Sequence, residues 1–291
     1  MEEARCAAFR YCRWLTVRAG SHFSFSFLLL SPERRRAMEA VYAFCRAMDD
    51  VVDREEAVPE EARRELDLWR RELDACEQGF PTHPIAVAIT EAACRHSIPI
   101  DLFRKLITGV EMDLGHRRYS TYEELRLYCE QVASVVGLIS VRVFGCRHPD
   151  SDRYATELGL ALQLINILRD LKSDAEQGRV YLPAEELQGF GCSEEELRAG
   201  KPSGPLLRLM ESHARKAWDH FGRASAALRS SGEGRRLLPA RIMGGVYAQL
   251  LRRIQRAGYD VFSRRIRVSR PEQFWIAAKC FLSVHPEPVE G

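Results

Sequence analysis

The sequence predicts an all-α fold, a helical bundle in a single domain over residues 1–291 with its core at about 20–280. Apolar side chains recur three or four residues apart along most of the chain, which is the period of one helix face. Gly and Pro interrupt this pattern at short intervals, and strand-like alternation appears only weakly, at 261–268. Helical runs without intervening strands favour a bundle over α/β units.

The first predicted helix, residues 33–53, has both an apolar period and a start signal. Apolar residues are spaced three or four apart from Met38 to Met48, and Ser31 with Pro32 supplies a cap and a first-turn proline. The same reasoning predicts helices at 59–78, 84–96, 99–115, 121–145, 150–177, 204–230 and 235–258, with breaks at 79–81, 98–99, 148–149 and 178. Residues 183–205 are predicted to be a loop, either a mobile flap or a plain surface connection, and the tail 284–291 is expected to fray.

Composition excludes several classes of protein. The net charge of +2 predicts no nucleic-acid partner, and the nine cysteines lack metal-ligand spacing, which indicates small buried thiols in a reducing cytoplasm. No secretion signal or membrane anchor is expected, because the apolar runs fall short of the ~20 residues that span a bilayer. No dinucleotide-binding glycine motif follows a strand, so no nicotinamide cofactor is expected. A cytoplasmic location is predicted, compatible with peripheral attachment to the membrane.

Two aspartate clusters carry the functional information. Asp49, Asp50 and Asp53 form the first, and Asp170 and Asp174 form the second. Carboxylates four residues apart on a helix repel one another, so a bound cation is the simplest reason for the spacing. Mg²⁺ binds one or two carboxylates and completes its shell with water and substrate phosphates. The clusters therefore predict a Mg²⁺–diphosphate site.

The second cluster belongs to a longer polar stripe. Asn166, Asp170 and Asp174 recur every four residues, Gln163 joins the edge of the stripe, and Arg169 and Lys172 flank it with positive charge. The oxygens suit a metal and the cations suit a phosphate. A solvated acidic face is the alternative, but the surrounding residues are so apolar that metal binding is favoured.

Five further residues have less specific signals. Arg46 precedes the first cluster by one helical turn and could orient a carboxylate, reach a phosphate or form an ordinary salt bridge. Asp113 is an acid in a helical context that could equally lie on the surface. Tyr42, Tyr128 and Tyr247 lie on apolar helices, where a core tyrosine with a bonded hydroxyl is the commoner role.

The Arg-rich segment 252–270, with Trp275 nearby, has two interpretations. It could rest on anionic lipid, or it could be a solvated helix face. The charges are not cleanly segregated from apolar residues, which favours the solvated face.

At YAFCRAMDDVVD, GVEMDLGHRRYS, LYCEQVASVVGL, LALQLINILRDLKSDAEQGRVYLP and RRLLPARIMGGVYAQLL the chain resembles the squalene/phytoene synthase family of head-to-head prenyl transferases. Within the family, SHFSFSFLLLSPERRRAM and GYDVFSRRIRV look most like bacterial presqualene diphosphate synthase of the hopanoid and squalene pathways. Glu130 stands where many relatives carry Tyr or Arg, and Ser31 where Leu usually precedes Pro. These departures bear only on the subfamily.

The resemblance implies an isoprenoid synthase-type fold with a central active-site cavity. It implies about three Mg²⁺ ions, with Mn²⁺ as an alternative. The implied metal ligands are Asp49, Asp50, Asp53, Asn166, Asp170 and Asp174. The implied substrate contacts are Tyr42, Arg46, Asp113, Gln163, Arg169 and Tyr247, with Tyr128 beside the reacting carbons; Asp49, Asp53, Asp170, Asp174 and Tyr128 are the expected catalytic residues.

The implied reaction joins two molecules of farnesyl diphosphate into presqualene diphosphate and releases diphosphate. Three alternatives stay open: a phytoene synthase that uses geranylgeranyl diphosphate, a dehydrosqualene or squalene synthase, and a non-catalytic assembly factor on the same fold. The last would be expected to lose aspartates from the clusters, and both are intact here. Further expected partners are a membrane surface and enzymes that act downstream.

Overall fold

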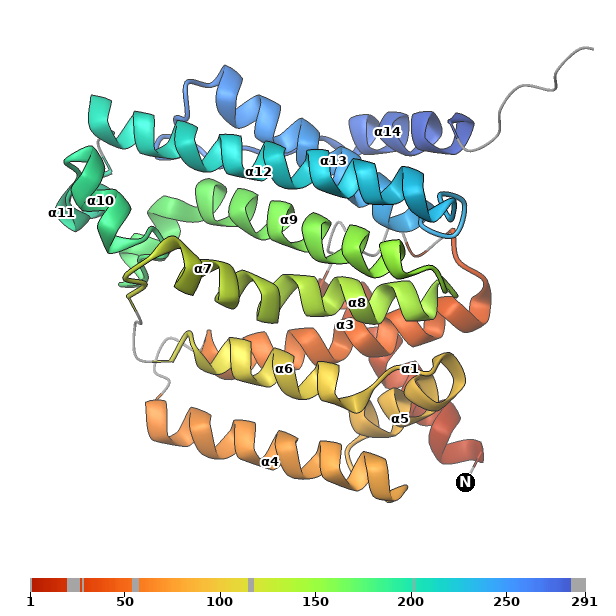
Figure 1. Ribbon diagram of the computed structural model, residues 1–291. Helices are drawn as coiled ribbons and strands as arrows, with labels where there is room; N and C mark the ends of the chain where they lie inside the picture. Colours follow the sequence, from red (N-terminus) through yellow and green to blue (C-terminus); the bar gives the residue numbers. More distant parts are fainter. Residues whose placement is uncertain are drawn as a thin grey trace, which may run out of the picture. The chain divides into compact units, whose positions relative to one another are not determined.

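The computed structural model describes residues 2–19, 27, 29–53, 58–114, 118–200 and 202–283 (Figure 1). Within these ranges the regular elements are helices, with one isolated bridge between Arg118 and Val180, so the predicted all-α fold is confirmed. Contacts between the elements divide the chain into two compact units. The first contains residues 1–117 and 130–147, and the second contains residues 118–129 and 148–291.

The first unit is built around α3 (Pro32–Val52), which contacts α1, α5, α6 and α8. Ser31 caps α3 and Pro32 opens it, as predicted. Phe44 is fully buried and meets Trp69 and Phe103 edge to face, with ring centroids 5.6 and 5.3 Å away. The other helices of the unit are α1 (Glu2–Ala19), α4 (Pro59–Gln78), α5 (Pro84–His96), α6 (Ile100–Glu111), the π-helical turn η1 (Glu130–Ser134) and α8 (Val135–Val143).

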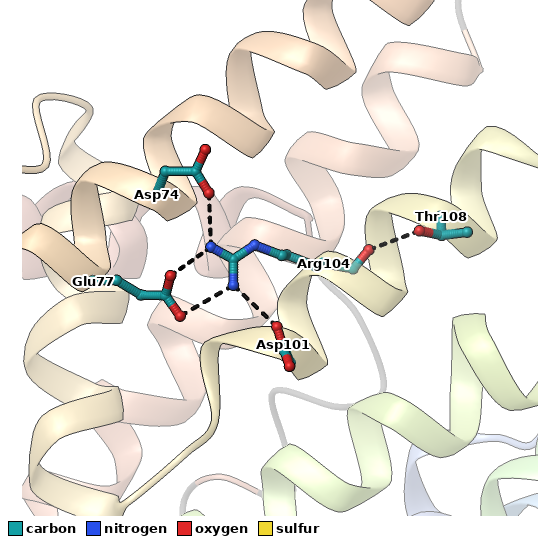
Figure 2. Close-up of polar contacts among 5 residues, drawn as sticks. All are labelled: Asp74, Glu77, Asp101, Arg104 and Thr108. Atoms are coloured by element: carbon teal, nitrogen blue, oxygen red, sulfur yellow. Dashed lines mark hydrogen bonds and ion pairs between the residues drawn. The ribbon is translucent and has the colours of Figure 1, made fainter.

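Ion pairs fasten α4 to α6 at the surface of this unit. Figure 2 shows the Arg104 guanidinium between Asp74, Glu77 and Asp101, with nitrogen–oxygen distances of 2.7, 2.7 and 3.0 Å. Closer to the end of α6, Arg70 pairs with Glu111 at 2.5 Å. The two arginines therefore hold the two helices together at separate points along their length.

The helix predicted at 121–145 is three segments. It runs as α7 (Tyr122–Cys129), turns with π-helical bonding at η1, and continues as α8. The units divide at the junction of α7 and η1. Periodicity does not reveal a π turn, because one extra residue shifts the apolar face by less than a third of a turn.

The second unit is built on α9 (Pro149–Glu176) and α12 (Gly204–Ser231), which lie side by side (Figure 1). Around them lie α7, α10 (Ala184–Phe190), α11 (Glu194–Ala199), α13 (Leu238–Arg256) and α14 (Arg270–Leu282). The predicted loop at 183–205 is wrong for most of its length, since α10 and α11 occupy it. Ser193 caps α11, and left-handed Gly191 and Gly200 end the two helices.

Other predictions need correction. The weak strand signal at 261–268 is wrong, because those residues are irregular. Helices α1 and α14 were not predicted, and α6 ends at Glu111 rather than at 115. All nine cysteines are free, but Cys6 and Cys94 are exposed, so the expectation of buried thiols fails for these two. The tail 284–291 lies outside the described residues.

None of the helices in the described ranges is both long enough and apolar enough to cross a bilayer.

Candidate functional site

The first aspartate cluster lies at the carboxyl end of α3. Tyr42, Arg46, Asp49, Asp50 and Asp53 fall on one face of the helix, and Asp53 is the C-cap that follows its last residue. Tyr42 is half-buried and the other four are exposed, whereas most of the residues between them are buried. The local sequence thus places the carboxylates on one face, as the spacing predicted, and that face is turned away from the core.

The acids of this cluster repel one another. The pKa of the Asp49 carboxyl is raised to about 7, first by desolvation in the protein around it and then by the charge of Asp53. Asp113 and Asp50 raise this pKa further, while Arg46 lowers it. Asp49 is nevertheless exposed to solvent, so the repulsion from neighbouring carboxylates is the part of this pKa shift that a ligand could change. A cation at this end of α3 would relieve it.

Asp113 is near enough to Asp49 to act on its charge, which the sequence did not reveal. It follows the end of α6, and its N–H donates to the Val110 carbonyl over 3.0 Å. Arg46 forms an ion pair with Asp50 at 2.5 Å, so the salt-bridge interpretation holds for this structure. Both partners are about half exposed, and such pairs contribute about 1 kcal/mol or less to stability.

The second cluster lies in the last turns of α9. Gln163, Asn166, Asp170 and Asp174 are all half-buried and form the predicted stripe. The apolar residues on either side of the stripe, Leu164, Ile165, Ile167, Leu168 and Leu171, are buried. The prediction that this acidic face would sit in an apolar setting is therefore confirmed.

Asn166 has an orphaned oxygen on this stripe. Its amide nitrogen donates to the Gln163 oxygen over 3.2 Å, but its own Oδ1 is buried and accepts no hydrogen bond. A buried carbonyl without a donor is costly unless something else satisfies it. An amide oxygen one turn before an aspartate is a good ligand for a hard cation. The donor set of this stripe thus fits Mg²⁺.

Tyr247 joins this stripe from α13. It is buried, and burial raises the pKa of its hydroxyl, while Arg169 and Asn166 lower it by hydrogen bonding. The Arg169 guanidinium donates two hydrogen bonds to the Asp170 carboxylate, one from Nε to Oδ1 over 2.9 Å and a second, short one from Nη2 to Oδ2. Hydrogen bonds to Asp170 keep the pKa of Arg169 raised although burial alone would lower it. Tyr247 is therefore a core tyrosine whose hydroxyl belongs to the polar stripe.

Two more basic residues lie near the stripe: Lys172, which the sequence placed beside it, and Arg265, which the sequence did not place there. Arg265 pairs with Asp170 at 3.5 Å, and Lys172 donates to the Phe262 carbonyl over 3.0 Å. Both contacts tie the irregular segment after α13 to the end of α9. The only sequence signal for Arg265 was its place in the Arg-rich segment, which did not show that it turns back to an aspartate.

Both clusters occupy helix carboxyl ends that have no basic residue in the last turn. A helix carries partial negative charge at this end, so carboxylates there are disfavoured twice, by the helix and by one another. Arginines offset part of this cost at Asp50 and Asp170, and a bound cation would offset the rest. No group of three or more His, Cys, Asp or Glu in the described ranges forms a ready metal site by itself.

Tyr128 lies in a buried aromatic cluster of the second unit. Its ring stacks on Tyr181 with centroids 5.3 Å apart, and Tyr119 lies 5.5 Å away. Tyr181 belongs to the GRVYLP stretch directly after the second aspartate cluster, a signal that could have marked it. Arg118 fixes this stretch by donating to the Gly178 carbonyl over 3.0 Å. Aromatic faces of this kind attract a cation.

Comparison with known proteins identifies the family. The profile of the squalene/phytoene synthase family matches residues 16–272. The chain belongs to this family. It is 36% identical to the 15-cis-phytoene synthase of Synechococcus elongatus over 90% of this chain and 88% of the relative. It is 34% identical to phytoene synthase of Mycobacterium tuberculosis over 95% and 91% of the two chains.

Solved structures of the family agree. A dehydrosqualene synthase matches with a TM-score of 0.85 and 24% identity, covering 97% of this chain and 99% of its own, which shows the shared fold. The squalene synthase HpnC from Alicyclobacillus acidocaldarius matches with a TM-score of 0.77 and 28% identity, covering 89% and 97%. The predicted family, the isoprenoid synthase-type fold and the prenyl transferase activity are thereby confirmed. The roles of the individual site residues stay predictions.

Proposed function

We propose that this family member condenses two molecules of farnesyl diphosphate head to head, in a Mg²⁺-dependent reaction that yields presqualene diphosphate and diphosphate for squalene or hopanoid synthesis. The family acts on prenyl diphosphates and uses a divalent metal with them. The observation that carries the proposal is the stripe on α9, where Asp170 and Asp174 accompany the orphaned oxygen of Asn166.

We propose that Asp170, Asp174 and Asn166 hold metal in the second unit, and that Asp49, Asp50 and Asp53 do so in the first. Bound Mg²⁺ would neutralise charge on the departing diphosphate as a Lewis acid. Side chains of the protein would position the substrate diphosphates. Arg169, clamped to Asp170, and the exposed Arg265 present guanidinium groups of the kind that bind phosphate in a bidentate manner.

The buried tyrosines are proposed to shelter the reacting carbons. Loss of diphosphate leaves an allylic carbocation, which survives only where water and other nucleophiles are excluded. The rings of Tyr119, Tyr128 and Tyr181 are each less than a tenth exposed and offer their π faces without a strong nucleophile. Attack by the double bond of the second substrate, followed by loss of a proton to the released diphosphate, then gives a cyclopropyl product.

Phytoene synthase is the second candidate. It is favoured by the identities of 36% and 34% to named phytoene synthases over 90% and 95% of this chain. The two candidates differ in the length of the prenyl chain, which a side-by-side turnover assay with farnesyl and geranylgeranyl diphosphate decides. Mass spectrometry of the product, with and without NADPH, also shows whether the reaction stops at the cyclopropyl stage. A forty-carbon product from the longer substrate alone would reject our first assignment.

The metal-binding roles are tested by substitution on α9. Asp170→Asn should lower kcat by about two orders of magnitude or more, because the charge that holds the metal is lost. Glu176→Gln makes the same chemical change at an exposed acid off the stripe and should leave kcat near that of the unmodified enzyme. Asn166→Ala should raise the Mg²⁺ concentration needed for half-maximal rate. If Asp170→Asn and Glu176→Gln behave alike, the proposed metal site is wrong.

A further inference from the structure

Helix α14 presents an apolar face away from the unit to which it belongs. It packs on α13, beside which it lies in Figure 1, with Ile276 and Cys280 near Gly245; Gln273 and Ala277 lie on the same face, and all four are buried or half-buried. The opposite face carries Phe274 and Trp275, each 60% exposed, then Phe281 at 49% and Leu282 at 70%. Four large apolar side chains therefore stand in solvent on a helix of 13 residues.

Helix α14 packs closely on α13, and polar contacts hold it at both ends. A Cβ at Gly245 of α13 would lie only 2.6 Å from the Ile276 side chain, so the two helices touch there without a spacer. At the start of α14, Arg253 binds the Glu272 carboxylate at 2.6 Å. At its end, Arg241 donates to the Ser283 hydroxyl over 2.7 Å. The helix thus holds its outer face in a fixed orientation.

The outer face follows the helical period. Phe274, Ala278 and Phe281 lie one above another at spacings of four and three, and Trp275 and Leu282 form a parallel row. Ala278 is also exposed, so the apolar stripe is continuous along the helix. An apolar stripe of this width normally faces a core or a partner.

The charges at the margin of the stripe are positive. Arg270 and Lys279 flank it on opposite sides by the helical period, and both are exposed. The Lys279 ammonium lies 3.6 Å from the centre of the Trp275 ring. The preceding segment adds exposed Arg264 and Arg267 and contains no acid between Ser263 and Arg270. The acid of the helix, Glu272, is already held by Arg253 and by the cap at Ser269.

We propose that the outer face of α14 docks on an anionic lipid surface. Aromatic rings beside aliphatic groups insert at the boundary of headgroups and acyl chains, while a basic margin binds anionic headgroups. The complementary charge is what selects lipid over a second copy of this chain, because two copies meeting face to face would bring their Arg and Lys margins together. The proposal is independent of which prenyl diphosphate the enzyme uses.

The sequence did not favour this interpretation, and the structure explains why. Within the Arg-rich segment, Phe262 is buried and Arg253 is paired, so that segment alone is a poor lipid-binding surface. The exposed rings belong instead to α14, which was not predicted as a helix. The lipid-binding surface therefore combines residues from two successive elements.

The experiment measures co-sedimentation of the full chain with vesicles of phosphatidylcholine alone and of phosphatidylcholine with about 30 mol % phosphatidylglycerol. We expect binding to the anionic vesicles that weakens as salt is raised from about 0.1 M to about 0.5 M. Phe274→Ser/Trp275→Ser should lower the partition coefficient at least about tenfold, because two aromatic side chains no longer leave water. Arg270→Gln/Lys279→Gln should lower it about tenfold on anionic vesicles only.

The matched control is Leu68→Ser/Phe80→Ser, which removes two exposed apolar side chains from and beside α4. It should bind vesicles as the unmodified chain does. Circular dichroism and light scattering on each variant report folding and oligomeric state. The proposal is overturned if the unmodified chain binds neither kind of vesicle, or if the control loses as much binding as Phe274→Ser/Trp275→Ser. It is also overturned if the unmodified chain binds no vesicles but forms a dimer by light scattering, and Phe274→Ser/Trp275→Ser converts that dimer to monomer.

Discussion

Two helical glycines are predicted to respond in opposite ways to the same substitution. Gly109 of α6 lies against the π-helical turn, where an added Cβ would stand 2.8 Å from Gln131 Cβ, 2.9 Å from Val132 Cγ1 and 3.0 Å from the backbone carbon of Gln131. Gly222 of α12 has no heavy atom within 4 Å of an added Cβ. The pair therefore separates helix propensity from crowding.

Alanine is favoured over glycine inside a helix by about 1 kcal/mol. Gly222→Ala should gain that amount, because nothing opposes it. At Gly109 the added methyl meets a backbone atom and a Cβ, neither of which can rotate away, and overpacking of this kind costs about 1–3 kcal/mol. The crowding outweighs the propensity, so Gly109→Ala should lose up to about 2 kcal/mol of stability net.

Urea unfolding followed by far-ultraviolet circular dichroism measures both free energies of unfolding. Hydrogen exchange then locates the effect, which should be loss of protection in α6 for Gly109→Ala and gain in α12 for Gly222→Ala. Because the glycines belong to different units, each change should be confined to its own unit. Stabilisation of similar size in both variants would refute the reasoning, since it would mean that the π turn moves aside at no cost.

The remaining predictions concern charge. Arg104→Ala should lower the free energy of unfolding by about 1 kcal/mol in low salt and by less in high salt. The reason is that the substitution leaves three exposed acids repelling one another where α4 meets α6. Equal losses at both salt concentrations would contradict this electrostatic explanation. Burial alone would raise the pKa of Glu186, but hydrogen bonds from His213 and Lys216 outweigh it and lower this pKa to about 2. A carboxyl group whose pKa is lower in the folded chain stabilises the fold at pH values above its unfolded pKa, and this stabilisation is lost as the pH falls towards the folded pKa. Glu186→Gln should therefore reduce the slope of unfolding free energy against pH between about pH 5 and pH 2, by up to about 1.4 kcal/mol per pH unit. If the curve of the variant stays parallel to that of the unmodified chain, the contact does not cause this pH dependence.

Local pattern was enough to predict the helical class and to mark the aspartate clusters, and the resemblance of several motifs was enough to name the family. The period of 3.6 residues placed Asn166, Asp170 and Asp174 on one face, and the apolar residues around them required that face to border a core. Such patterns depend only on neighbours within a few turns of the same helix. They can therefore be recognised in the sequence before any tertiary contact is known.

Only the tertiary structure decided which distant groups meet. It brought Asp113 within electrostatic reach of Asp49, left the Asn166 oxygen without a donor, and returned Arg265 to Asp170. Helix α14 is the clearest case, because RPEQFWIAAKCFL is apolar on both faces and its period does not tell inside from outside. The contact with α13 buries one face and leaves Trp275 and its neighbours in solvent. Burial is a property of packing between elements, so a sequence in which both faces of a helix are apolar does not determine it.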